Sequence, residues 1–212
     1  LHVLADFTDN VSAFVELDQN NVWGDDFRSD YVTGLDSRAV TDNSVEVYQA
    51  YVNLANIANL PLQLRIGRQE LAFGGGWLVG TNGAGQKFLG LSFDGVRSTY
   101  STDLLSVDEF WTKPRETFAI EEDGDVDFYG LYGSYKGVPN TVIDAYWFFL
   151  RDAQQYANTR GPYSNIMENY LGLDDYNAVE LHTVGARADT TLGGLSLAAE
   201  LAYQFGDAGR IG

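Results

Sequence analysis

The sequence predicts an all-β protein, an antiparallel up-and-down transmembrane β-barrel, and two observations support this fold class. Apolar and polar side chains alternate with a period of two along most of the chain, which is typical of strands with two different faces. The connections between the predicted strands are alternately short and long, so an up-and-down sheet would have short turns at one end and long loops at the other. A soluble β-sandwich does not require connections sorted in this way.

The first predicted strands cover residues 1–8, 11–23, 45–55 and 61–70. Within them the stretches VSAFVELDQ, VEVYQAYVNL and LPLQLRIG place aliphatic side chains at every second position, opposite polar, aromatic or small ones. Short segments rich in Asn, Asp and Pro separate the first strand from the second and the third from the fourth, as expected for tight turns.

The remaining predicted strands bring the total to about ten, and they cover residues 91–101, 104–113, 126–137, 140–151, 178–190 and 195–206. The same alternation is present in TVIDAYWFFL and LSLAAELAYQ. Long connections at 24–44, 71–90, 114–125 and 152–177 separate the predicted hairpins.

The two faces of the predicted strands differ in chemistry. The aliphatic and aromatic face, which includes Val52 and Leu197, is expected to contact lipid, whereas Asn53 and Ser196 are expected to face the lumen. Aromatic residues near strand ends support a membrane interface, namely Trp23, Tyr100, Trp111 and Tyr203. The opposite face mixes small residues with Glu16, Asp18, Gln49, Arg65, Asp144, Arg187, Glu200 and Gln204.

The ends of the sequence suggest a domain that continues beyond it. Leu1 lies inside a strand pattern, and Gly212 follows the start of what should be another long loop. A barrel must close to remove its edges. We therefore expect residues 1–212 to form a single barrel domain that is incomplete at both ends, part of a barrel of about 16–18 strands.

Composition excludes several function classes. The net charge of −17 argues against nucleic-acid binding, which needs a basic surface. Cysteine is absent, so neither a disulfide framework nor a thiolate metal site is expected. The longest uncharged run, Val47 to Leu64, is interrupted by asparagines and a proline, and it does not predict a transmembrane helix. No secretory signal peptide is visible at the start.

The stretch RIGRQELAFGGGWLVG links a predicted strand to a long loop. Gln63, Arg65 and Gly67 share one face of the strand, and Gly67 followed by an out-of-phase Arg68 suggests a β-bulge. The glycines at 74–76 begin a loop that we expect to fold inward as a constriction. A phosphate-binding loop is rejected, because the glycine-rich segment 80–85 is followed by Gln where the lysine is required.

Arginines on the polar face are the main candidate site. We expect the pore-lining and solute-binding residues to be Arg65, Arg68, Arg97, Arg187, Gln63, Glu200 and Gln204. Arginine is always charged and binds carboxylates through two hydrogen bonds, which suits an anionic solute. The alternative is that the arginines neutralise acids of the barrel interior, with Glu70, Asp94, Glu200 and Asp189 as the partners.

Acidic clusters occur in the predicted long loops. Asp123, Asp125 and Asp127 have the spacing of oxygen ligands for Ca²⁺, although the glycine that should follow is Phe128. Such loops are also expected to contact lipopolysaccharide through divalent cations. No other cofactor is expected, and no catalytic residue is predicted, since His2 and His182 lie on distant strands and no nucleophile motif is present.

Two parts of the chain resemble the alginate-export family of bacterial outer-membrane barrels. LRIGRQELAFGGGWLVG and LSFDGVRSTY are similar to that family's "GRQ…G…FDG-R" signature on consecutive strands. TVGARADTTLGGLSLAAELAYQFGD looks like its later "G-R…E-YQFG" hairpin, and YQAYVNL and VIDAYWFFLRD fit the intervening strands. The resemblance implies a pore in the bacterial cell outer membrane. An alginate pore would be lined by positive charge, whereas this chain has 13 basic residues against 30 acidic ones, so the family is better supported than the alginate substrate.

The expected function is therefore that of an outer-membrane channel or porin. It would pass an anionic or polar solute such as a polysaccharide, with outer-membrane lipid and lipopolysaccharide as its surroundings. Two alternatives remain open from the sequence: a soluble or surface β-sandwich that binds carbohydrate, and a barrel that acts as a scaffold for a partner protein. We do not expect an enzyme.

Overall fold

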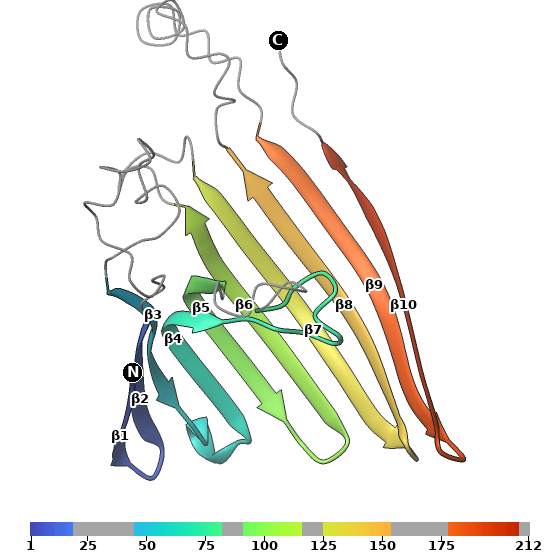
Figure 1. The fold of residues 1–212 in the computed structure, drawn as a ribbon, viewed down its shortest axis with the longest axis horizontal. Helices are drawn as coiled ribbons and strands as arrows, with labels where there is room; N and C mark the ends of the chain where they lie inside the picture. Colours follow the sequence, from blue (N-terminus) through green and yellow to red (C-terminus); the bar gives the residue numbers. More distant parts are fainter. Residues whose placement is uncertain (19–44, 82–90, 116–124, 154–177, 208–212) are drawn as a thin grey trace, which may run out of the picture.

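The described strands form one antiparallel sheet. The structure is a computed structural model, and it describes residues 1–18, 45–81, 91–115, 125–153 and 178–207. Within these ranges ten strands pair in sequence order, each with its neighbours along the chain (Figure 1). Their bounds are β1 His2–Thr8, β2 Val11–Asp18, β3 Glu46–Leu54, β4 Leu62–Glu70, β5 Ser92–Ser101, β6 Leu105–Arg115, β7 Val126–Val138, β8 Thr141–Asp152, β9 Val179–Leu192 and β10 Leu195–Asp207.

This arrangement confirms the predicted all-β, up-and-down architecture, and it does not contain the two stacked sheets of a β-sandwich. Predicted and observed strands agree to within a few residues, except that 19–23 of the second predicted strand lie outside the described residues. The described part of the chain has a single short 3₁₀ segment, Ile57–Asn59, and none of its helices is long and apolar enough to cross a membrane.

The short connections gather at one end of the sheet, as the sorted loop lengths predict (Figure 1). The β9–β10 turn explains how so short a connection is possible. Gly193 and Gly194 both have positive φ, 56° and 87°, which a two-residue turn matched to the twist of a hairpin requires. An antiparallel meander then places the strand ends that flank the long connections at the opposite end.

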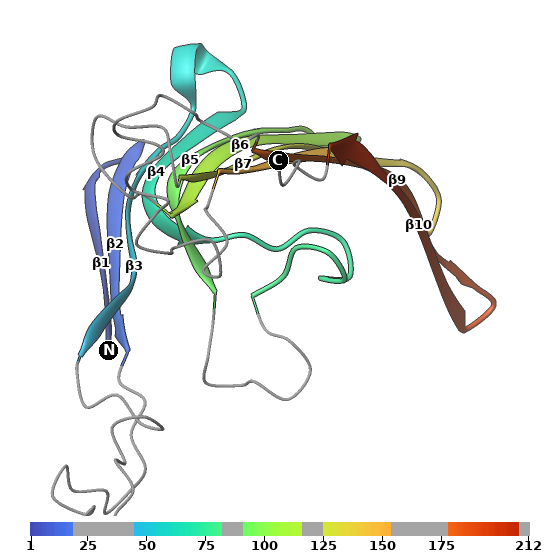
Figure 2. The ribbon, with the colours of Figure 1, turned by 90° about the horizontal axis from the view of Figure 1, so that it is seen from above.

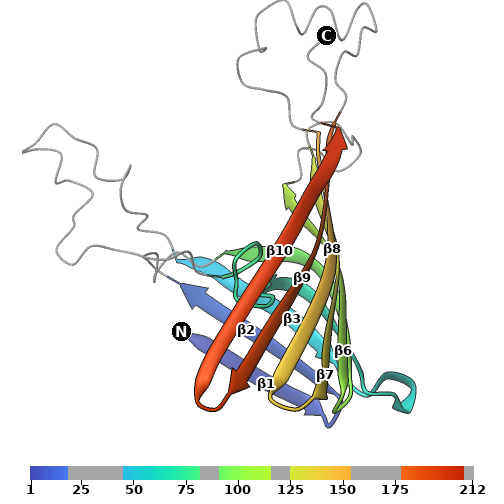
Figure 3. The same cartoon turned by 90° about the vertical axis from the view of Figure 1, so that its right-hand side faces the viewer.

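The sheet curves into a trough. Figure 2 shows β4–β8 as its floor, with β1–β3 on one side and β9 and β10 on the other. Among the described strands β1 pairs only with β2 and β10 only with β9, so the sheet is open and has the form of part of a larger barrel. Residues 71–81, which follow β4, lie on the concave side, between β10 and β1–β3 (Figures 2 and 3).

Burial alternates along the central strands, but in the reverse sense to a soluble protein. On the concave face the side chains are buried, and several of them are polar: Asp108, Thr112, Asp144 and Thr183. On the convex face the exposed side chains are large and apolar, among them Ile66, Leu131, Ile143, Trp147 and Leu201. So many large exposed apolar side chains are unusual for a protein surrounded by water, and they suit a lipid environment.

An aromatic row crosses the convex face of β6–β10. The register places its members directly opposite one another on successive strands: Trp111, Tyr129, Phe149, His182 and Phe205. The rings of Phe149 and His182 stack with centroids 4.5 Å apart, and those of His182 and Phe205 at 5.2 Å. Two residues further along each of β7–β10, toward the long connections, the same face has a row of charged residues. They are Asp127, Arg151, Glu180 and Asp207.

Along the strands the convex face changes from apolar to aromatic to charged residues, and this order is found where a barrel passes from the membrane into water. The row includes Trp111, which was expected to mark an interface, and Tyr203 lies next to it on β10. Trp23, the other tryptophan in that expectation, is outside the described residues.

Candidate solute path on the concave face

The loop after β4 is anchored on the concave face by three apolar side chains. Leu71, Phe73 and Val79 are 0%, 7% and 9% exposed, and they form one core cluster with Phe110, Tyr132, Tyr146 and Phe148 of β6–β8. The ring of Phe73 lies 4.9 Å from that of Tyr132 and 5.3 Å from that of Phe110. The expected inward fold of this loop is therefore observed.

The glycine triplet allows the loop to turn and to approach the far strands closely. Gly74 and Gly76 have positive φ, 56° and 73°, which favours glycine. A β-carbon on Gly74 would lie 2.8 Å from the hydroxyl oxygen of Tyr132 and 3.1 Å from Cδ of Arg187. The loop thus extends from β4 as far as the Arg187 side chain of β9, and it narrows the space above the concave face.

Two of the four candidate arginines form ion pairs on the concave face. Arg187 contacts Asp144 at 3.1 Å and Asp189 at 2.5 Å, with the arginine side chain 14% exposed and that of Asp144 3% exposed. Arg97 contacts Asp108 at 2.8 Å, and Asp108 also accepts a hydrogen bond from the hydroxyl of Thr99. Of the three observed partners, Asp189 is one of the acids expected to neutralise the arginines, whereas Asp108 and Asp144 were not expected as partners.

Arg65 differs from these two arginines. Within the described residues it has no ion pair, and its Nε has no hydrogen-bond partner although it is buried. Its guanidinium carbon lies 4.2 Å from the ring centre of Tyr51, a cation–π contact. The register places Arg65 directly opposite Arg97, so two positive charges adjoin here, and of the two only Arg97 contacts a carboxylate among the described residues. Gln63 lies on the same face and donates a hydrogen bond to Asn53.

Glu200 and Gln204 of β10 also have partners on the concave face. The hydroxyl of Tyr146 donates to Glu200 at 2.9 Å, and the amide of Gln204 donates to the Thr183 hydroxyl oxygen at 3.0 Å. Tyr146 reaches β10 by crossing Gly185, where a β-carbon would lie 2.3 Å from the ring. These two candidates are therefore held by neighbouring side chains of the wall.

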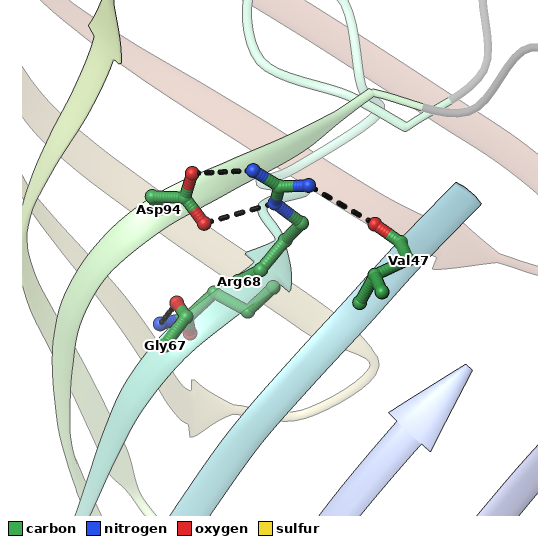
Figure 4. Close-up of polar contacts among 5 residues, drawn as sticks. Val47, Gly67, Arg68 and Asp94 are labelled. Carbon is green, nitrogen blue, oxygen red and sulfur yellow. Dashed lines mark hydrogen bonds and ion pairs between the residues drawn. The ribbon is translucent and has the colours of Figure 1, made fainter. Parts of the chain in front are cut away.

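Arg68 does not belong to this set, and the predicted bulge at Gly67 is wrong. Pairing of β4 with β3 and with β5 runs through Gly67 without a shift, so Arg68 lies on the opposite face from Arg65, together with Ile66. Figure 4 shows Arg68 between β3 and β5, where it binds Asp94 through two hydrogen bonds of 2.9 and 2.7 Å and the carbonyl oxygen of Val47 at 3.1 Å. Asp94, one of the acids expected to pair with the arginines, is therefore bound by an arginine, but on the convex face.

The GRQ and FDG segments bind each other. The register pairs Gly67 with Gly95, Arg68 with Asp94, and Gln69 with Phe93. A β-carbon would lie 2.3 Å from a carbonyl oxygen at Gly67 and 2.2 Å from one at Gly95, so neither position has room for a side chain. Gln69 is fully buried, and its amide donates to the backbone carbonyls of Gly67 and Gly95 at 3.3 and 3.4 Å.

A double-mutant cycle tests whether the Arg68–Asp94 contact stabilises the pairing of the GRQ and FDG segments. We expect Arg68→Ala, Asp94→Ala and the double variant to give a coupling free energy above the roughly 1 kcal/mol that limits exposed pairs, because lipid screens charge less than water. Unfolding in liposomes measures it. Arg68→Lys keeps the charge and should lose most of the coupling, since an ammonium group cannot form the paired hydrogen bonds. A coupling free energy near zero would mean that the Arg68–Asp94 pair does not stabilise the contact between the two segments.

The predicted calcium ligands have other contacts where they are described. Asp125 pairs with Lys113 at 2.8 Å, and Asp127 accepts a hydrogen bond from the indole of Trp111 at 3.1 Å. Asp123 lies outside the described residues. Within the described ranges no three His, Cys, Asp or Glu side chains form a group suited to a metal ion, so the calcium site stays a prediction.

The fold and the site together define a class of protein: a curved up-and-down sheet of barrel type, apolar on its convex face, with a loop folded onto a charged concave face. The particular family follows from comparison with known proteins. The chain matches the alginate export family model over residues 1–211, and it belongs to that family, as the sequence resemblance predicted. A search of curated proteins found no match.

Proposed function

We propose that the protein is an outer-membrane channel that passes an anionic or polar solute along its concave face. The observation that supports this most directly is the reversed burial: large apolar side chains are exposed on the convex face, while charged groups lie on the concave face beneath an inward loop. A protein of this kind places lipid and lipopolysaccharide against the apolar face and water against the charged one. Membership of the alginate export family agrees with a polysaccharide as the solute.

Arg65 is the group through which the channel would favour anions. Arg97 and Arg187 have carboxylate partners within about hydrogen-bond distance, which offsets their charge, whereas Arg65 has none among the described residues. Its charge therefore acts on the solute path, and salt screens it over about 8 Å at physiological ionic strength. The chain's overall charge of −17 is a poor guide to this local environment.

Two substitutions separate a selecting arginine from a structural one. We expect Arg65→Ser in the full-length protein to shift the reversal potential in a salt gradient toward lower anion preference, with little change in melting temperature. The shift should shrink as salt increases. Planar-bilayer recordings measure both effects.

Arg97→Ser is the matched variant on the facing strand. It removes the partner of the buried Asp108 carboxylate, and leaving a buried charge unpaired costs about 3–5 kcal/mol. We expect a lowered melting temperature for this variant. An unchanged reversal potential in Arg65→Ser would refute the anion-selecting role, and full-length protein that gives no conductance steps would refute the channel itself and favour a scaffold.

A further inference from the structure

Trp77 is exposed at the tip of a loop that is otherwise firmly anchored. Its exposed fraction is 62%, although Phe73 and Val79 on either side are almost fully buried. The backbone N–H of Phe73 donates to the carbonyl of Val79 at 3.0 Å, and that of Gly76 donates to Phe73 at 2.9 Å. These bonds close the loop around Trp77, so its backbone is fixed while its indole stays uncovered by the described residues.

Polar groups lie beside the loop residues that precede Trp77. Residues 74 and 75 of the same loop adjoin Arg187, since a β-carbon on Gly75 would lie 3.9 Å from Nε of that arginine. Arg187 in turn contacts Asp189, whose side chain is 41% exposed. The loop thus presents a flat apolar surface two residues after a segment that adjoins a guanidinium, which donates hydrogen bonds, and that guanidinium pairs with a part-exposed carboxylate, which accepts them.

We propose that Trp77 is a stacking platform for one sugar ring of the solute, with the Arg187–Asp189 pair binding the hydroxyl or carboxylate groups at the edge of that ring. A pyranose has an apolar C–H face and a polar rim, and it needs an aromatic surface on one side and hydrogen-bonding groups at its edge. Among residues 71–81 Trp77 provides the exposed aromatic surface, and the Arg187–Asp189 pair provides the polar groups.

This inference rests on the proposed channel, and the experiment separates the two. The full-length protein is recorded in planar bilayers, and a hexamer of glucose or of mannuronate is added as a blocker of the open current. We expect Trp77→Ala to weaken the block by about tenfold for both sugars, and Trp77→Phe to keep most of it. Leu78→Ala is the control, because it removes a neighbouring apolar side chain that is 39% exposed without removing a ring.

Three results would overturn the proposal while leaving the channel intact. The first is an unchanged block in Trp77→Ala. The second is an equal loss of block in Leu78→Ala. The third is a change of sugar-free conductance in Trp77→Ala, which would mean that the indole holds the loop in place. Benzoate tests the alternative ligand, since a Trp77-dependent block by benzoate with none by the sugars would assign the site to aromatic acids. Absence of any conductance would instead refute the channel.

Discussion

Replacing Phe73 with alanine should raise the open-channel conductance several-fold. The ring of Phe73 packs against Phe110, Tyr132 and Phe148 and is 7% exposed, so it is the central anchor of the inward loop. Removing a buried phenylalanine side chain costs about 3–5 kcal/mol. A short loop held by three apolar side chains cannot retain its position after such a loss, and the solute path should widen. Single-channel recordings of the full-length protein measure the change.

The control for this experiment is a truncation of similar kind away from the loop. Leu104 lies in the β5–β6 turn and is 58% exposed, so Leu104→Ala should leave the conductance unchanged. If Phe73→Ala lowered the melting temperature without changing the conductance, the loop would be a structural element of the wall and would not limit the path.

Placing arginine on the convex face should cost more than placing it on the concave face. Val52 is 41% exposed and lies between Ala13 of β2 and Ile66 of β4, with no acidic residue directly opposite it. A charge at the bilayer midplane destabilises a barrel by about 2–4 kcal/mol. We therefore expect Val52→Arg to reduce the free energy of folding into liposomes by an amount in this range, as measured by denaturant titration.

Asn53→Arg is the matched variant, because Asn53 is the next residue and lies on the concave face beside Arg65. It should cost less, since a lumenal face is wet and the new charge meets a screened repulsion from Arg65 and the loss of the hydrogen bond from Gln63. Equal costs at the two positions would contradict the assignment of the faces. Leu197, also expected to face lipid, is a weaker test because it is only the third residue of β10, close to the turn.

The fold was predictable because its information is local. A period of two specifies both faces of a strand, and turn residues such as Gly193 and Gly194 mark where the chain reverses. The inward loop was predictable for the same reason, since three glycines between apolar residues indicate a tight turn that packs against something. These are properties of residues close together in the sequence, and predicting them requires neither the strand order nor the register between strands.

The ion pairs were only partly predictable, because they depend on register. Arg97 lies directly opposite Arg65 on one side and Phe110 on the other, and it reaches Asp108 diagonally. A shift of the ladder by two residues would give it different partners. Gly67 was misleading for a different reason: its φ of 124° marks a local distortion, yet the ladders with β3 and β5 both continue through it without a bulge.

The position of the inward loop, which packs on strands that follow it in the sequence, has a consequence for the order of folding. The loop joins β4 to β5, yet its apolar side chains rest on β6–β8 and its glycines adjoin Arg187 of β9. The surface that the loop packs against does not exist until β6–β9 have paired. In addition, contacts between distant parts of a chain form slowly because of the entropy lost in closing long loops. We therefore expect residues 71–81 to dock late in folding, so that the solute path is wide until the loop narrows it.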